Sequence, residues 1–210
     1  MESKHVVRAV IAAYAAVVIS FVSATWFSER QSAEVERAAL SIHRNAAPSI
    51  HRLAAARGEL RRLQLLVHRA VEQESAPSMV LEISAGRELL DQQLSAYEAL
   101  PLYPGEEAAW QQAKRADGRL EDNLTQIVRA LEHGELHSAR QLEGQFDGSI
   151  EELAKSLSQD IDVNVAAAAM LAGKIQSSRR QGIGWAITIG IASLLPLVAL
   201  ATALLRCRVY

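Results

Sequence analysis

The 210-residue sequence has few aromatic residues, a single cysteine and no excess of either charge. Aromatic residues make up 5% of the chain although apolar residues make up 50%, because alanine and leucine, two strong helix formers, supply most of the apolar content. The lone Cys207 excludes an intrachain disulfide. With a formal net charge of -2 and interleaved acids and bases, no basic face is available for nucleic acid. We predict an all-α protein that is stabilised by packing and has no nucleic-acid partner.

Two long segments carry no formal charge. Residues Ala9 to Phe27 form a run of 19 uncharged residues, about 28 Å as a helix and close to the thickness of one hydrocarbon core. A second run extends from Ile183 to Leu205. Trp26 and Trp185 lie at the ends nearest the middle of the chain, where aromatic residues at the membrane interface are typical. We predict transmembrane helices at 9–27 and 183–205, with the lipid bilayer as a partner.

The short segments outside these runs, 1–8 and 206–210, each carry two residues of the Lys and Arg type. Under the positive-inside rule both termini are expected in the cytoplasm and residues 28–181 in the periplasm of a bacterial inner-membrane protein. The alternative is a cleaved signal peptide, because Val22-Ser23-Ala24 resembles a cleavage site. Helical periodicity continues directly past this site, which favours a membrane span.

The segment between the apolar runs has the pattern of four helices. We predict them at Ser28–Glu74, Ala76–Leu100, Gly105–His133 and Glu135–Gln181, with Pro and Gly residues at the turns. Short connections make neighbouring helices antiparallel, so the expected architecture is an up-down-up-down four-helix bundle whose first and last helices continue into the two transmembrane helices. The seam residues at heptad spacing are Val35, Ala39, Ile42, Ala46, Leu53, Ala56, Leu60, Leu63, Val67, Val80, Ile83, Leu90, Leu94, Tyr97, Trp110, Ala113, Leu120, Leu124, Ile127, Leu131, Ala139, Phe146, Ile150, Leu153, Leu157, Ala168, Leu171 and Ile175.

Three features together resemble the extracytoplasmic four-helix-bundle sensor domain of methyl-accepting chemotaxis receptors and bacterial sensor histidine kinases. A membrane span leads into a long first helix, the fourth helix opens with Gly134-Glu135-Leu136-His137-Ser138-Ala139, and that helix runs into a second span. The resemblance implies a signal-input module that converts ligand or envelope state into relative movement of two membrane helices. It implies a binding module, not an enzyme.

Receptors of this type continue after the second span into a signalling domain, whereas five residues follow Leu205 here. We therefore expect an input module without its own output domain, with a separate kinase or signalling protein as partner. The chain is then either a truncated receptor or a stand-alone protein. The alternative function is a structural or regulatory bundle that pairs with full-length receptors and senses nothing itself.

A basic stretch on the first helix is the candidate ligand site. The resemblance implies that small anionic ligands bind between subunits at this level, and guanidinium groups suit carboxylates. The other interpretation is a solvated face whose cations pair with Glu59 and Glu72. The candidate residues are Arg57, Arg61, Arg62 and Arg69.

No motif predicts a metal site, a cofactor or a catalytic centre. His133 and His137 are four residues apart, a spacing that on one helix would bring two imidazoles to one metal, but Gly134 between them predicts a helix break. The thiol of Cys207 could be acylated at the cytoplasmic membrane surface; an unmodified thiol is the simpler expectation.

The predicted helix lengths indicate a homodimer. The first and last helices each have 47 residues between Ser28 and Glu74 and between Glu135 and Gln181, about 70 Å, whereas the middle two reach only about 38 to 44 Å. Near the membrane the long pair would have only each other, and two copies of this pair would form a second four-helix bundle.

Pro48 lies within the first predicted helix, where its missing N–H and its ring disfavour an α-helix by roughly 3 kcal/mol. Counting residues from the far end of the bundle places Pro48 level with the loop between the second and third helices. We predict a kink there that acts as a hinge, with the amide of Asn164 satisfying the carbonyl of Arg44. The alternative is a static kink.

Overall fold

The computed structural model describes residues 2–72 and 76–208. The described residues are 95% helix and include no strand, so the all-α prediction is confirmed. The elements are α1 (Glu2–Ser41), the π-helix η1 (Ile42–Ala46), α2 (Ala47–Glu72), α3 (Ala76–Glu98), α4 (Glu106–Glu132) and α5 (Leu136–Arg208). These bounds agree with the predicted helices to within two residues at the turns between α3, α4 and α5. The end predicted at Glu74 falls outside the described residues.

The chain divides into two compact units. One, called the two-helix unit below, consists of residues 1–40 and 171–210; the other, called the bundle unit, consists of Ser41–Met170.

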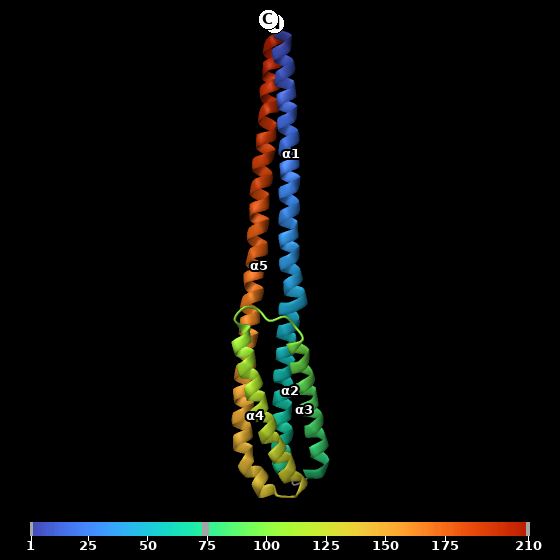
Figure 1. Cartoon of the computed structure of the whole chain (residues 1–210), viewed down its shortest axis with the longest axis vertical. Helices are drawn as coiled ribbons and strands as arrows, with labels where there is room; N and C mark the ends of the chain where they lie inside the picture. Colours follow the sequence, from blue (N-terminus) through green and yellow to red (C-terminus); the bar gives the residue numbers. More distant parts are fainter. Residues whose placement is uncertain (1, 73–75, 209–210) are drawn as a thin grey trace. The chain divides into compact units, whose positions relative to one another are not determined.

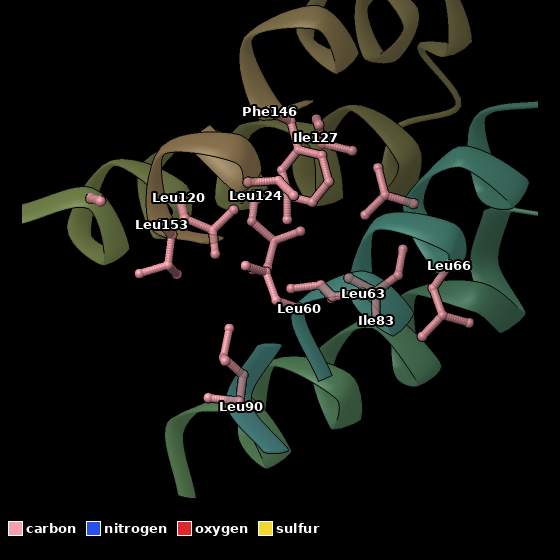
Figure 2. Close-up of a cluster of buried hydrophobic side chains, with 14 of the residues drawn as sticks. Leu60, Leu63, Leu66, Ile83, Leu90, Leu120, Leu124, Ile127, Phe146 and Leu153 are labelled. Atoms are coloured by element: carbon pink, nitrogen blue, oxygen red, sulfur yellow. The ribbon is translucent and has the colours of Figure 1, made fainter. Parts of the chain in front are cut away.

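In the bundle unit, α2, α3, α4 and the N-terminal part of α5 lie side by side around one apolar core (Figure 1). Figure 2 shows Leu60, Ile83, Leu124 and Phe146, one residue from each helix, within this core. Every predicted seam residue between Ala46 and Leu157 is buried, except Val80, which is partly buried. The heptad pattern therefore predicted the core because each helix presents one apolar stripe at the spacing of its own turn.

Polar contacts link each helix of the bundle unit to two neighbours. The contacts join α2 to α3, α3 to α4, α4 to α5 and α5 back to α2. They are Arg52 Nη1 to Gln93 Oε1 at 3.2 Å, Arg87 Nη1 to Asp117 Oδ1 at 2.6 Å, Arg119 Nε to Glu152 Oε2 at 3.0 Å, and Gln64 Nε2 to Asp147 Oδ1 at 2.8 Å. The four helices thus form a closed ring around the core.

The turn between α4 and α5 is closed by Gly134. With a φ of 73°, this residue has the left-handed conformation that glycine adopts without a Cβ penalty. The N–H of Glu135 donates to the carbonyl of Ala130 at 2.8 Å and that of Gly134 to Leu131 at 3.1 Å, which is a Schellman motif. The predicted helix break at this glycine is confirmed.

In the two-helix unit, α1 packs against the C-terminal part of α5. The rings of Phe27 and Trp185 have centroids 5.5 Å apart. The side-chain amide of Gln31 donates to the carbonyl of Ser178 and lies against Gly182, where the absence of a Cβ makes room for it. These contacts join α1 to α5 within the two-helix unit.

In the two-helix unit, large apolar side chains are exposed along the two predicted spans. Large side chains that are more than half exposed include Ile11, Tyr14, Ile19, Phe21, Val22, Trp26, Trp185, Ile187, Ile191, Leu194, Leu195 and Val198. Among the described residues, the helix Val10–Glu72 is long and apolar enough to cross a membrane, by length and composition. The second predicted span lies within α5, and a two-pass topology stays a prediction.

Candidate functional site

The helix irregularity expected at Pro48 takes the form of a π-helix directly before it. Across η1, the N–H of Ala47 donates to the carbonyl of Ile42, five residues back instead of four. The wider turn brings two consecutive residues, Asn45 and Ala46, onto the buried side, while the predicted seam residue Ile42 is only half-buried. A proline that cannot donate a helical hydrogen bond is a known cause of such a turn. The hinge function stays a prediction.

The loop between α3 and α4 contacts the start of this π-helix. The hydroxyl of Tyr103 lies 3.2 Å from Ser41 Oγ and 3.3 Å from the Ser41 carbonyl. Pro48 was predicted to be level with this loop; the contact lies seven residues before it in the chain, or about 10 Å along a helix. The structure therefore places the residue that precedes the irregular turn beside the loop between α3 and α4.

Next to this loop is a buried polar cluster, defined here as Tyr97, Glu106, Asp160 and Asn164. Each of its four residues is at most 1% exposed. The carboxylate of Glu106, the first residue of α4, accepts hydrogen bonds from the Tyr97 hydroxyl and the Asn164 amide, and one from the backbone N–H of Tyr103 at 2.6 Å. The cluster thereby joins α3, α4, α5 and the loop.

The predicted role of Asn164 is wrong. Its side-chain amide donates to Glu106 and to the carbonyl of Asp160, the latter at 2.9 Å, so both amide hydrogens are committed away from the Arg44 carbonyl. The prediction failed because counting along helices estimated the height of Asn164 but not the direction of its side chain, which faces the first turn of α4.

Asp160 has no donor for either carboxylate oxygen in the described structure, and Asn164 Oδ1 is also without a partner. Burial and, to a smaller extent, the nearby charge of Glu106 together raise the pKa of Asp160 to about 7. Burial likewise raises the pKa of Tyr97, to which the hydrogen bond with Glu106 adds. The cluster therefore holds two carboxyl groups of which only Glu106 is provided with donors.

The sequence carried a signal for this cluster that was missed. Asp160 and Asn164 continue the seam of Leu153 and Leu157 at spacings of three and four, and Glu106 precedes Trp110 by four residues. The predicted seam passes from Leu157 to Ala168 without these residues, because it consists of apolar and small residues alone. A polar residue at a seam position is a sign of a buried polar network.

The four predicted arginines do not form one site. Arg57 and Arg61 line a groove of about 590 Å³ whose opposite wall, on α5, includes Asp147 and Glu151. Gly144 and Gly148 also line the groove, and a Cβ on either would meet no atom within 4 Å, so open space lies beside both.

Arg62 and Arg69 are exposed and are not part of this groove. Arg62 lies 3.9 Å from Glu59, the partner that the solvated-face interpretation expected. Arg62 is five residues from Arg57 and therefore lies on another face of the helix. Arg69 is eight residues from Arg61, which is about 12 Å further along the helix.

The described residues contain no group of three or more His, Cys, Asp or Glu side chains that could hold a metal ion. His133 Nδ1 lies 2.8 Å from the carbonyl of Arg129, and His137 Nε2 lies 3.1 Å from the amide of Gln141. Each histidine therefore has a local partner on its own helix. The side chain of Cys207 falls outside the described side chains.

No protein-family model and no curated protein matches this chain. The fold and the candidate site together define a helical-bundle protein with a helix that is able, by length and composition, to cross a membrane.

Proposed function

We propose that the chain is a membrane-anchored sensor module, a signal-input protein whose bundle lies in the periplasm of a bacterium. In this proposal α2, α3, α4 and the first part of α5 run up-down-up-down, residues 9–27 and 183–205 cross the inner membrane, and both termini are cytoplasmic. The observation that carries it is the contrast in apolar burial: Tyr14 and Phe21 are 73% and 72% exposed in the two-helix unit, whereas most large apolar side chains of the bundle unit are buried. An apolar surface this large indicates a lipid or protein environment.

A pair of reporter fusions tests this topology. A reporter that is active only in the periplasm should be active when fused after Gln181 and inactive when fused after Tyr210. Activity after Tyr210 would contradict the two-pass arrangement, and inactivity after Gln181 would contradict a periplasmic bundle.

We propose a homodimer formed along the helices that lead toward the membrane. Val35, Ile42, Leu171 and Ile175 are predicted seam residues that stay half-buried in a single chain, so they have apolar surface left for a second copy. Single cysteines at Val35 or Ile42 should crosslink between two chains in membranes, with Cys207→Ser as the background. A cysteine at Glu36, which is exposed, is the control and should crosslink much more slowly.

The groove at Arg57 and Arg61 is the proposed ligand site for a small anion. Two guanidinium groups four residues apart can hold one carboxylate through charge-assisted hydrogen bonds. A panel of small carboxylates should include at least one that raises the melting temperature of the full chain in micelles. That shift should disappear in Arg57→Met with Arg61→Met.

The matched control is the double variant Arg62→Met with Arg69→Met, which removes the same charge outside the groove and should keep the shift. If the panel gives no shift, or if the control loses it equally, the groove is not the site. A bundle that binds full-length receptors and no ligand would then favour the structural function.

Signal passage is proposed to use η1 and Pro48 as a hinge at the edge of the bundle. Replacing Pro48 with alanine restores a donor for the Arg44 carbonyl and should favour a regular α-helix over the π-turn. Crosslinking at Ile42→Cys should then change in rate and lose its response to ligand. Pro101→Ala is the control and should crosslink at the rate of the parent. If Pro48→Ala also crosslinks at the parent rate, Pro48 is a static kink and not a hinge.

A further inference from the structure

The buried polar cluster contains a carboxyl group that the bundle does not equip to be ionised. Asp160 is fully buried and neither of its oxygens has a donor. The Glu106 carboxylate, also in the cluster, accepts three hydrogen bonds. A buried carboxylate without donors is strongly disfavoured, whereas one with several donors is stabilised in its charged form.

Among the described residues, no cation pairs with Asp160 or shifts its pKa. The titratable side chain that α4 contributes is Glu106, and the one that α3 contributes is Tyr97. Both interact electrostatically with Asp160. The buried polar side chains of η1 and α2 are Asn45 and Ser49, neither of which titrates. On α5 itself the buried polar side chains one turn away are Ser156 and Asn164, neither of which titrates.

We propose that Asp160 is a proton-binding site of the bundle, protonated while Glu106 is ionised, and that losing this proton loosens the contacts among α3, α4 and α5. A protonated Asp160 gains an O–H donor. Asn164 Oδ1, one turn further along α5, is the acceptor in the cluster that has no partner among the described residues. One proton thus removes the buried charge of Asp160 and supplies a donor for Asn164 Oδ1.

Proton loss has a defined structural consequence. Two buried carboxylates on α4 and α5 would then repel each other, and the hydrogen bonds that Glu106 makes with Tyr97, Asn164 and the Tyr103 N–H would carry the strain. Tyr103 in turn contacts Ser41 at the start of η1. The proton would therefore regulate the end of the bundle that adjoins the π-helix.

The test compares Asp160→Asn with Asp162→Asn in the full chain in detergent micelles. Asn imitates the neutral carboxyl, and Asp162 is an exposed residue two positions away on the same helix, so both variants remove the same formal charge. The melting temperature of the wild type should fall by roughly 5–10 °C between about pH 5 and pH 8. Asp162→Asn should show the same fall and Asp160→Asn should lose most of it.

A second measurement keeps the test decisive if Asp160→Asn folds poorly. The side-chain carboxyl carbon of Asp160, assigned through its bonds to the backbone resonances of the wild type, should titrate in the NMR spectrum of the wild type with a midpoint near pH 7. A midpoint near the ordinary value of about 4, or an equal pH response in both variants, overturns the proposal. The proposal is also overturned if Na⁺, Mg²⁺ or Ca²⁺ at about pH 8 stabilises the wild type but not Asp160→Asn, because Asp160 would then be a cation site.

This inference depends on the contacts of the bundle unit and not on the proposed sensor function. The topology fusions can fail while Asp160 titrates near neutrality, and the reverse can also occur, so the two failures are distinguishable.

Discussion

In the bundle unit Leu63 is fully buried and Leu65 is 63% exposed, and each helix repeats this division between one apolar stripe and a polar face. In the two-helix unit Ile19, Phe21, Leu194 and Leu195 are all more than half exposed. Two helices have only one line of contact, so most of an apolar circumference stays outside it. The comparison indicates that a bundle in water needs one stripe per helix, whereas helices that are apolar all round need a different solvent.

The two units also differ in the polar groups that lie between their helices. The bundle unit encloses Glu106 and Asp160, two carboxyl groups, within its core. The two-helix unit joins its helices through neutral groups, the Gln31 amide and the Ser178 carbonyl. A four-helix core is thick enough to bury a carboxylate together with its donors, as it does for Glu106, while a helix pair is not.

The largest effect is expected where charge is placed on the apolar surface of the two-helix unit. Leu194→Lys with Leu195→Lys should prevent insertion of the second span, because each lysine near the middle of a membrane helix costs about 3 kcal/mol. Cys207 should then react with a membrane-impermeant thiol reagent added outside spheroplasts, whereas the wild type should be protected.

The control places the same substitutions at two leucines of equal exposure in the bundle unit. Leu65→Lys with Leu81→Lys changes side chains that are 63% and 75% exposed and should leave Cys207 protected. Equal labelling of both double variants would break the comparison between the units.

A large loss is also expected at the bundle core. Leu63→Ala should lower the free energy of unfolding by about 2–5 kcal/mol, because it leaves a cavity among well-packed side chains. Leu65→Ala, the same change two residues away, should stay within about 0.5 kcal/mol of the wild type. Denaturant unfolding followed by helical circular dichroism measures both; equal losses would show that the core is elsewhere.

A smaller effect is expected where Gln31 lies against Gly182 in the two-helix unit. Gly182→Ala adds a Cβ where the Gln31 side chain lies, so Gln31 must move and its bond to Ser178 is lost, at about 1 kcal/mol. Gly184→Ala adds the same group where no atom lies within 4 Å and should have no such effect.

Disulfide formation within one chain measures this difference. Phe27→Cys with Trp185→Cys, in a Cys207→Ser background, replaces two rings whose centroids are 5.5 Å apart. The bond should form more slowly when Gly182→Ala is added and at the parent rate with Gly184→Ala. The opposite order would mean that Gln31 does not hold these helices together.

The smallest effect is expected at an exposed ion pair of the bundle. His68 Nδ1 lies 2.7 Å from Glu143 Oε1, and this hydrogen bond, with the charge of Glu72, raises the pKa of His68 above 6.5. The pairing therefore contributes stability that is full below the ordinary pKa and is lost as pH rises through the folded pKa. His68→Gln should slightly lower the melting temperature in acid only, whereas His51→Gln should not; an equal change at alkaline pH would exclude an ionic origin.

Much of the bundle could be predicted because its seam follows the helical repeat. Leu53, Leu60, Leu120 and Leu153 were placed in the core from spacing alone, and Gly134 was placed at a helix end from its conformational freedom. The candidate site was predicted less well. Arg57 and Arg61 share a groove, but Arg62 and Arg69 do not, because the side of a helix that faces a neighbour depends on which helices adjoin it.

By itself the sequence determined the helical class, the helix ends and the apolar stripes, since these depend on residues within a few turns of one another. Only the tertiary structure decided the partners of Asn164, the burial of Asp160 beside Glu106, and the π-turn before Pro48. The first two of these features join residues that are 58 and 54 positions apart, Asn164 with Glu106 and Asp160 with Glu106. Whether a carboxyl group lies in water or is buried beside another carboxyl group depends on such contacts, and no local pattern specifies them.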